Sequence, residues 1–155
     1  MSRPIFKETR QGQTLLFPPS LEEIVPSHHP VRVVNSVIDK INLDSVYEEY
    51  KGGGTSSFSP RMLLKVIVYC YMLNIYSSRR IESALKENIF LMWLSGMSYP
   101  DHNTINRFRS GKLKDKIQII FPQIVMLLHE AGLVDIKDLY TDGTKIEANA
   151  NRYTF

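Results

Sequence analysis

The stretch from Pro60 to Tyr76 constrains the fold most, because it predicts a helix that is apolar on almost every side. Ser59 can cap this helix and Pro60 fits its first turn, which together form a strong start signal. The stretch contains Lys65 and Asn74 and is too short to span a bilayer, so no membrane partner is expected. A helix of this kind belongs at the centre of a core. The sequence therefore predicts a mainly α fold in which other helices surround this one.

Helical spacing of apolar residues recurs on both sides of the central stretch. The capping-box pair Ser20 and Glu23 predicts where the first helix begins. Gly111 is expected to end the helix before it, Gly132 fits the end of the last helix, and Pro122 should kink or divide that helix. The predicted helices cover residues 20–25, 31–42, 44–50, 79–88, 89–94, 103–110 and 114–131.

Three regions are expected along the chain. Residues 1–19 form an extended arm, residues 20–132 form an irregular multi-helix domain, and residues 133–155 begin with strand-like runs at 139–141 and 144–148. Asp142-Gly143 joins these runs and is typical of a tight β-hairpin turn. The same Asp, placed at the end of a strand, could instead be a metal-binding carboxylate. The residues alone leave both interpretations open.

Composition limits the functions of the chain. A formal charge of +3 over 155 residues is only weakly basic, so nucleic-acid binding would need local clustering of charge. Cys70 is the single cysteine, which excludes an internal disulfide and favours a reducing, cytoplasmic compartment. We interpret Cys70 as a buried core thiol. The first ten residues contain no apolar segment typical of a signal peptide.

The segment 103–116 concentrates side chains that suit DNA binding. Ile105 and Phe108 should anchor one face, which leaves Asn and Arg side chains for base edges and Lys side chains for phosphates. With the helix at 79–88 it resembles a helix-turn-helix, although the intervening linker is much longer than usual. The alternative is a solvated charged helix of a bundle. The candidate DNA-binding residues here are Asn103, Thr104, Asn106, Arg107, Arg109, Lys112 and Lys114.

Arg79 and Arg80 occupy the first turn of a predicted helix, where positive charge opposes the helix dipole. This cost indicates an anionic partner. Either Glu82 or Glu87 of the same helix or a DNA phosphate would satisfy them, and the sequence does not choose between these.

Three ordered stretches, at 76–82, 100–109 and 142–155, resemble the DDE-type transposases of bacterial insertion sequences. The resemblance implies a helical N-terminal domain that binds transposon-end DNA, followed by the start of an RNase H-like catalytic domain. It implies that Asp142 is the first Mg²⁺-binding carboxylate of the catalytic triad. The other two carboxylates would lie beyond residue 155, so a truncated and catalytically incomplete protein, associated with the nucleoid, is expected.

Two other functions stay open. One is a stand-alone DNA-binding regulator that inhibits transposition. The other is a helical interaction module that pairs with itself, as a homo-oligomer, or with an intact transposase. DNA binding requires an open surface around Arg107, whereas a protein interface would expose apolar residues between Ile117 and Leu128.

Overall fold

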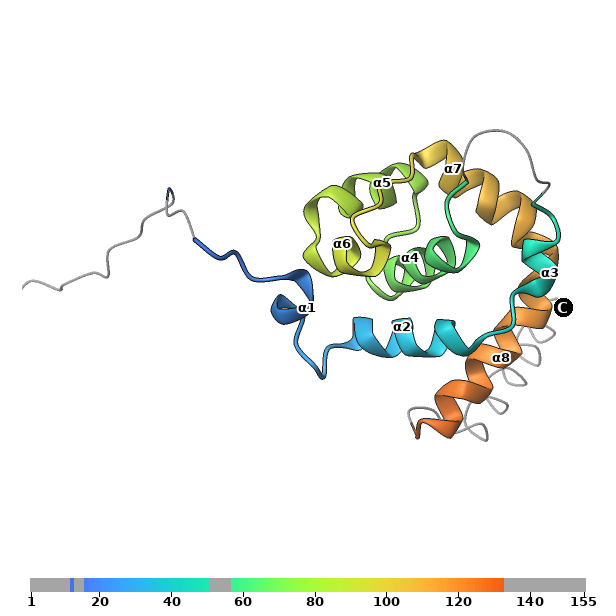
Figure 1. The fold of residues 1–155 in the computed structure, drawn as a ribbon. Helices are drawn as coiled ribbons and strands as arrows, with labels where there is room; N and C mark the ends of the chain where they lie inside the picture. The colour runs from blue at the N-terminus through green and yellow to red at the C-terminus, as the bar shows by residue number, and fades with distance from the viewer. Residues whose placement is uncertain (1–11, 13–15, 51–56, 133–155) are drawn as a thin grey trace, which may run out of the picture.

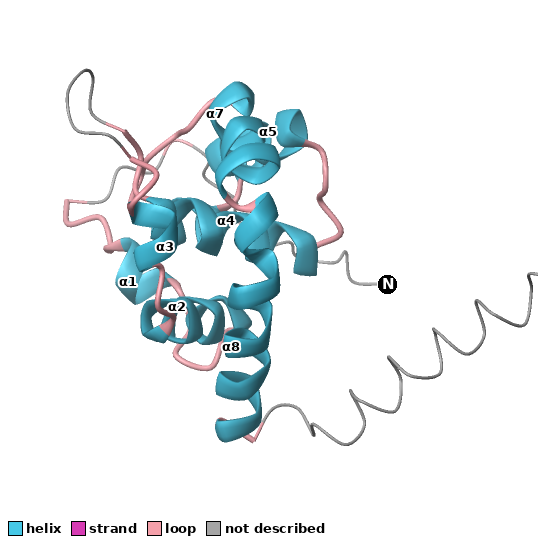
Figure 2. Ribbon diagram, turned by 90° about the vertical axis from the view of Figure 1, so that its right-hand side faces the viewer, coloured by secondary structure: helices cyan, strands magenta, loops and turns pink. Residues whose placement is uncertain are grey.

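The computed structural model describes residue 12 and residues 16–50 and 57–132. The predicted hairpin at 139–148, with Asp142, lies outside the described residues, as does most of the predicted arm. Every regular element that the described residues form is helical (Figures 1 and 2). This confirms the mainly α prediction for the helical domain.

Helices follow one another along the chain, and residues 48–59, part of which the structure does not describe, separate α3 from α4 (Figure 1). Their bounds are α1 (Leu21–Ile24), α2 (Pro30–Lys40), α3 (Asp44–Tyr47), α4 (Pro60–Met72), α5 (Ser78–Glu87), α6 (Ile89–Ser95), α7 (His102–Arg107), a π-helical turn (Phe108–Lys112), a 3₁₀ turn (Lys114–Lys116) and α8 (Ile117–Glu130).

Helix α4 lies at the centre of the core, as predicted. Leu64, Val66 and Cys70 are at most 1% exposed, and α4 packs against both α2 and α6. The helix ends at Met72, four residues earlier than expected. Asn74 adopts a left-handed conformation with φ of 59°, and the Ile75 N–H turns back to the Cys70 carbonyl at 2.8 Å. Asn tolerates this conformation better than most residues, which explains the early end.

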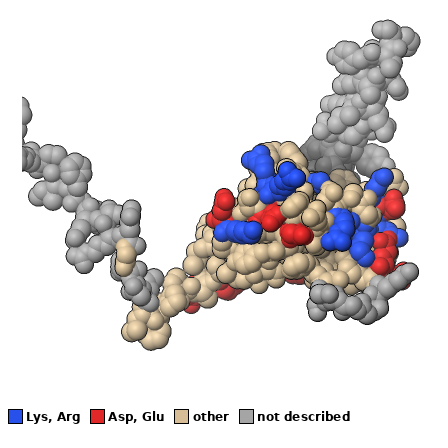
Figure 3. All heavy atoms as spheres, turned by 90° about the horizontal axis from the view of Figure 1, so that it is seen from above, with Lys and Arg blue, Asp and Glu red and all other residues tan. Residues whose placement is uncertain are grey.

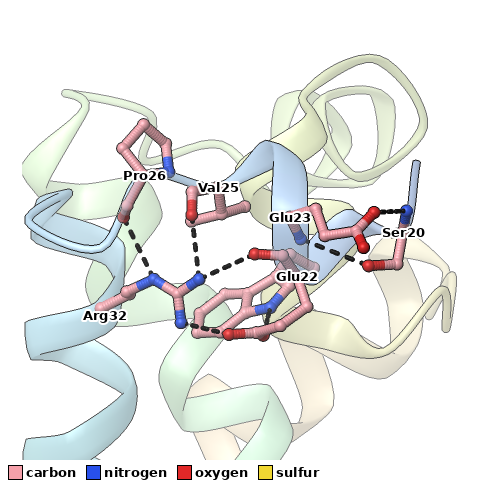
Figure 4. A network of polar contacts seen from close by, with 7 residues as sticks. Ser20, Glu22, Glu23, Val25, Pro26 and Arg32 are labelled. Atoms are coloured by element: carbon pink, nitrogen blue, oxygen red, sulfur yellow. Dashed lines mark hydrogen bonds and ion pairs between the residues drawn. The ribbon is translucent and has the colours of Figure 1, made fainter.

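Helix α1 is only four residues long and depends on its two ends. At its start the predicted capping box is confirmed, since the Ser20 Oγ accepts from the Glu23 N–H at 3.3 Å and Glu23 accepts from the Ser20 N–H at 2.8 Å. Figure 4 shows both contacts.

At the other end of α1, Arg32 of α2 satisfies the free carbonyl groups (Figure 4). Its guanidinium donates to the carbonyls of Glu22 and Val25 at 2.9 Å and of Pro26 at 3.1 Å. It also pairs with the Glu22 carboxylate at 2.5 Å and lies 5.0 Å from the ring centre of Trp93. The Trp93 indole N–H donates to Glu22 at 2.6 Å. Arg32 therefore joins α1, α2 and α6, and we call this network the Arg32 clasp.

The chain stays helical from α7 into α8, but the winding changes twice on the way. Gly111 was expected to end the helix, and this was wrong: it lies inside the π-helical turn, where the Leu113 N–H reaches the Phe108 carbonyl at 2.9 Å. Pro122 was expected to kink or divide the last helix; it does not divide it, because α8 continues through it. The predicted single helix 114–131 is instead a 3₁₀ turn followed by α8.

Helix α8 packs against α2 but leaves several of its apolar side chains exposed. Ile120 is the one fully buried residue of this helix. Ile119, Phe121 and Met126 are 58%, 55% and 57% exposed. None of the described helices has the length and apolar character needed to cross a membrane.

Candidate nucleic-acid interface

Helices α5 and α7 lie side by side, although a long segment separates them in sequence. Ile81 and Leu85 of α5 and Ile105 of α7 are fully buried between the helices and the core. A polar contact joins the helices as well, since Glu82 accepts from the backbone N–H of His102 at 3.0 Å and lies 2.7 Å from its Nδ1. The pairing of these two helices was predicted, and α6 occupies much of the long linker between them while packing on α5.

Asp101 fixes the start of α7. Its carboxylate caps the helix by accepting from the Thr104 N–H at 2.8 Å. This hydrogen bond lowers the pKa of Asp101 below its usual value, so the cap is ionised at neutral pH. Because Asp101 caps α7 and Ile105 packs it against the core, the helix is held in place and the side chains at its outward positions point in a fixed direction. Asn103, Asn106 and Arg107 occupy these positions and are exposed.

Arg79 and Arg80 are exposed in the first turn of α5. The carboxylate of Glu82, which was one expected partner, is instead engaged by His102 and by Lys86 at 3.4 Å. Within the described part of the chain, neither arginine forms an ion pair or a side-chain hydrogen bond. The sequence offered Arg79 and Arg80 either an acidic residue of the same helix or a DNA phosphate as a partner. An anion from outside the domain is the partner that remains.

Arg109 has a structural position that the sequence did not reveal. Its guanidinium donates to the Tyr76 carbonyl at 2.6 Å, to the Tyr71 hydroxyl at 3.3 Å and to the Asn106 side chain at 3.3 Å. Arg109 thereby ties the segment that precedes α5 to α7. It supports the surface formed by the other candidates and has fewer donors left for a phosphate.

Lys112 is also engaged within the domain. Its ammonium group donates to the Glu49 carbonyl at 3.1 Å and lies 3.5 Å from the ring centre of Tyr50, while Lys116 pairs with the Glu49 carboxylate at 3.6 Å. These contacts fasten the segment after α7 to the end of α3. Lys114, by contrast, is exposed.

The candidate residues thus differ in position. Arg109 and Lys112 hold elements together and Thr104 is half-buried, whereas an outward-facing set on α5 and α7 is exposed; Lys114 is exposed in the 3₁₀ turn. Figure 3 shows that Lys and Arg gather in separate clusters on the upper face, with Asp and Glu between them. We call the outward-facing set the α5–α7 face; it consists of Arg79, Arg80, Asn103, Asn106 and Arg107.

No metal site can be assigned among the described residues, since they contain no group of three or more His, Cys, Asp or Glu side chains that could hold an ion. Asp142, the one predicted metal ligand, lies outside them. The described residues therefore do not show how a Mg²⁺ ion would be held.

These features define a small helical domain with exposed cationic and amide side chains on a pair of packed helices. The family model described as Transposase domain (DUF772) matches residues 19–111, which is more than half of the chain. The chain belongs to this family, and it is a transposase-family protein of the insertion-sequence type. Searches of curated proteins and of solved structures find no match.

Proposed function

We propose that the helical domain binds the DNA at the ends of an insertion sequence through the α5–α7 face. Arg79 and Arg80 contact phosphates, while Asn103, Asn106 and Arg107 lie where they could reach base edges. Arg and Asn are the side chains that pair bidentately with guanine and adenine. The observation that carries the proposal is the pair of exposed arginines in the first turn of α5, which have no internal partner in the described structure.

The catalytic part of the proposal concerns Asp142. We propose that it is one carboxylate of a Mg²⁺ site that serves DNA strand transfer, as the family resemblance implies. Such a site needs further carboxylates around the ions, and the described helical domain provides no cluster of this kind. In this proposal the α5–α7 face recognises DNA and Asp142 serves the chemistry, so the helical domain can occupy ends, or act there as an inhibitor, independently of the metal site.

Fluorescence anisotropy with two labelled duplexes tests the DNA-binding proposal. One duplex carries the terminal repeats that flank the gene and the other a scrambled sequence, and both are titrated at several salt concentrations. We expect tighter binding to the repeats. Arg107→Ala should reduce that preference by roughly 1–3 kcal/mol, because a base contact is lost.

Arg79→Ala and Arg80→Ala should weaken binding to both duplexes and lower the salt slope by about 1 each. Lys40→Ala, at an exposed cation of α2, is the matched control and should leave the preference unchanged. Equal binding to both duplexes that disappears with added salt would reduce the interaction to unspecific phosphate attraction and contradict the proposal.

A second function, association with another protein, is favoured by one observation. Helix α8 exposes Ile119, Phe121 and Met126, which is unusual for a helix with a packed side. Light scattering of the purified chain separates the two functions. A dimer that Met126→Glu dissociates, together with unspecific DNA binding, would favour the interaction module over the DNA-binding domain.

A further inference from the structure

A cavity of about 530 Å³ opens beside the α5–α7 face, between the end of α3, the start of α4 and α7 with its π-helical turn. Its volume lies within the range typical of small-molecule sites. Arg107 belongs to both the cavity wall and the α5–α7 face. A ligand that crosses the face therefore meets the cavity at Arg107.

Positive charge dominates the cavity. Arg107 and Lys112 line it, and none of its described lining residues is acidic. Lys112 uses donors for the Glu49 carbonyl and faces the Tyr50 ring, but an ammonium group has a further N–H available. Within the described domain the Arg107 guanidinium donates no hydrogen bond and forms no ion pair. Both side chains can therefore donate to an anion.

The cavity also offers an aromatic surface. Phe58 lines it and is 37% exposed, so one part of its ring is open to a ligand. Lys112 covers the Tyr50 ring, and burial raises the pKa of Tyr50, so its hydroxyl keeps its proton at neutral pH. Ser57 and Thr104 add hydroxyl groups to the wall. A flat apolar surface next to two cations and several hydroxyls matches the chemistry of a nucleotide.

We propose that this cavity binds one unpaired nucleotide of a DNA strand, with its base against Phe58 and its phosphate at Lys112 and at those of the Arg107 N–H donors that a base-edge contact leaves unused. A paired base cannot reach the cavity without leaving the duplex stack, so the ligand is a nucleotide at an unpaired or frayed end. The inference rests on the proposed function in one respect, because the DNA strand reaches the cavity across the α5–α7 face. It adds a strand-end contact that duplex binding alone does not include.

A titration with a single nucleotide tests the cavity independently of duplex binding. Backbone amide NMR signals are followed while deoxyadenosine monophosphate, inorganic phosphate or deoxyadenosine is added. We expect the monophosphate to shift the amides of Thr104 and Lys112 and to bind more tightly than either other probe. Absence of these shifts, or equal binding of inorganic phosphate, overturns the nucleotide site whether or not the chain binds duplex DNA.

Variants then assign the base contact. Phe58→Ala should weaken the nucleotide about tenfold, the order expected for the loss of one stacked base. Phe58→Leu keeps an apolar side chain without the ring and should weaken it as well, which separates stacking from loss of folding. Tyr47→Ala, at an exposed aromatic of α3 outside the cavity lining, is the matched control and should bind normally. Unchanged affinity in both Phe58 variants overturns the assignment.

A comparison of blunt and overhang duplexes relates the cavity to DNA. We expect a duplex with unpaired 3′ nucleotides to bind about tenfold more tightly than the blunt duplex, and Phe58→Ala to remove this difference without changing the blunt affinity. Equal affinities in the wild-type chain overturn the strand-end inference. In that case blunt binding that still depends on Arg79 and Arg80 would leave the proposed function intact, so the two failures are distinguishable.

Discussion

The Arg32 clasp predicts that one side chain of α2 determines whether α1 stays folded. A four-residue helix cannot stabilise itself, because too few hydrogen bonds offset the ordering of its backbone. Arg32 supplies three hydrogen bonds to carbonyls at the end of this helix. We therefore expect Arg32→Ala to destabilise the domain even though α1 itself buries little surface.

The magnitude follows from the kind of contact that is lost. A hydrogen bond contributes roughly 0.5–1.5 kcal/mol net, and the Arg32 side chain is 26% exposed, so water replaces part of the loss. The three carbonyl contacts together then amount to about 2 kcal/mol. For a chain of this length each kcal/mol lowers Tm by roughly 2–4 °C, which gives a decrease of about 4–8 °C.

The ion pair with Glu22 should matter much less than the carbonyl contacts. The Glu22 side chain is 63% exposed, and exposed ion pairs contribute little because water and salt screen them. Glu22→Gln should therefore leave Tm close to the wild-type value. Arg32→Lys should resemble Arg32→Ala, because an ammonium group cannot reach three carbonyls with the geometry of a guanidinium.

Thermal unfolding followed by circular dichroism at 222 nm measures these changes. Trp93 is the single tryptophan and belongs to the clasp, so its fluorescence reports on the same region. The carbonyl contacts do not hold α1 in place if Arg32→Ala unfolds at the wild-type temperature, or if Glu22→Gln lowers Tm as much as Arg32→Ala does.

Two further predictions concern titration and reactivity. Hydrogen bonds from His102 and then Lys86 hold the pKa of Glu82 below its usual value of 4.5, so its stabilising contribution is complete above that pH and is lost as the pH falls through the lower value of the folded state. The wild type should therefore lose stability as the pH falls below 4.5, and acid unfolding monitored by circular dichroism measures this loss. Glu82→Gln has no carboxylate to protonate and should flatten this part of the profile. An identical profile for the variant and the wild type would contradict the assignment. Burial raises the pKa of Cys70 to about 12, so iodoacetamide at pH 8 should leave the folded chain unmodified by mass spectrometry and label it after unfolding in guanidinium. Rapid labelling of the folded chain would show that the thiol is accessible.

Features that depend on neighbours in sequence could be predicted. Apolar spacing placed the helices, and the three-residue separation of Ser20 and Glu23 revealed the capping box. The inward positions of Ile105 and Phe108 followed from the same spacing, and both are buried. These predictions hold because the interactions that decide them act within one or two helical turns.

Features that depend on distant contacts could not be predicted. Arg109 meets the Tyr76 carbonyl, and Lys112 meets the Glu49 carbonyl, across 33 and 63 residues. A backbone carbonyl has no sequence signature, so nothing in the segment 103–116 distinguished these two cations from the exposed ones. The cavity at Arg107 likewise combines three separate elements. Gly111 was misjudged for a related reason, since a glycine often ends a helix but can also lie in a wider turn.

The π-helical turn between α7 and α8 adds a residue to the connection between the two helices without adding a turn. A π-helical turn contains one residue more than an α-helical turn, and each residue of an α-helix turns the chain by about 100°. The wider turn takes up its extra residue within one revolution, so α8 keeps nearly the phase that ordinary winding without that residue would give it. Deletion of one residue at Gly111 should therefore restore an α-helical turn and leave the exposed apolar side chains of α8 in nearly the same relation to the cationic face of α7.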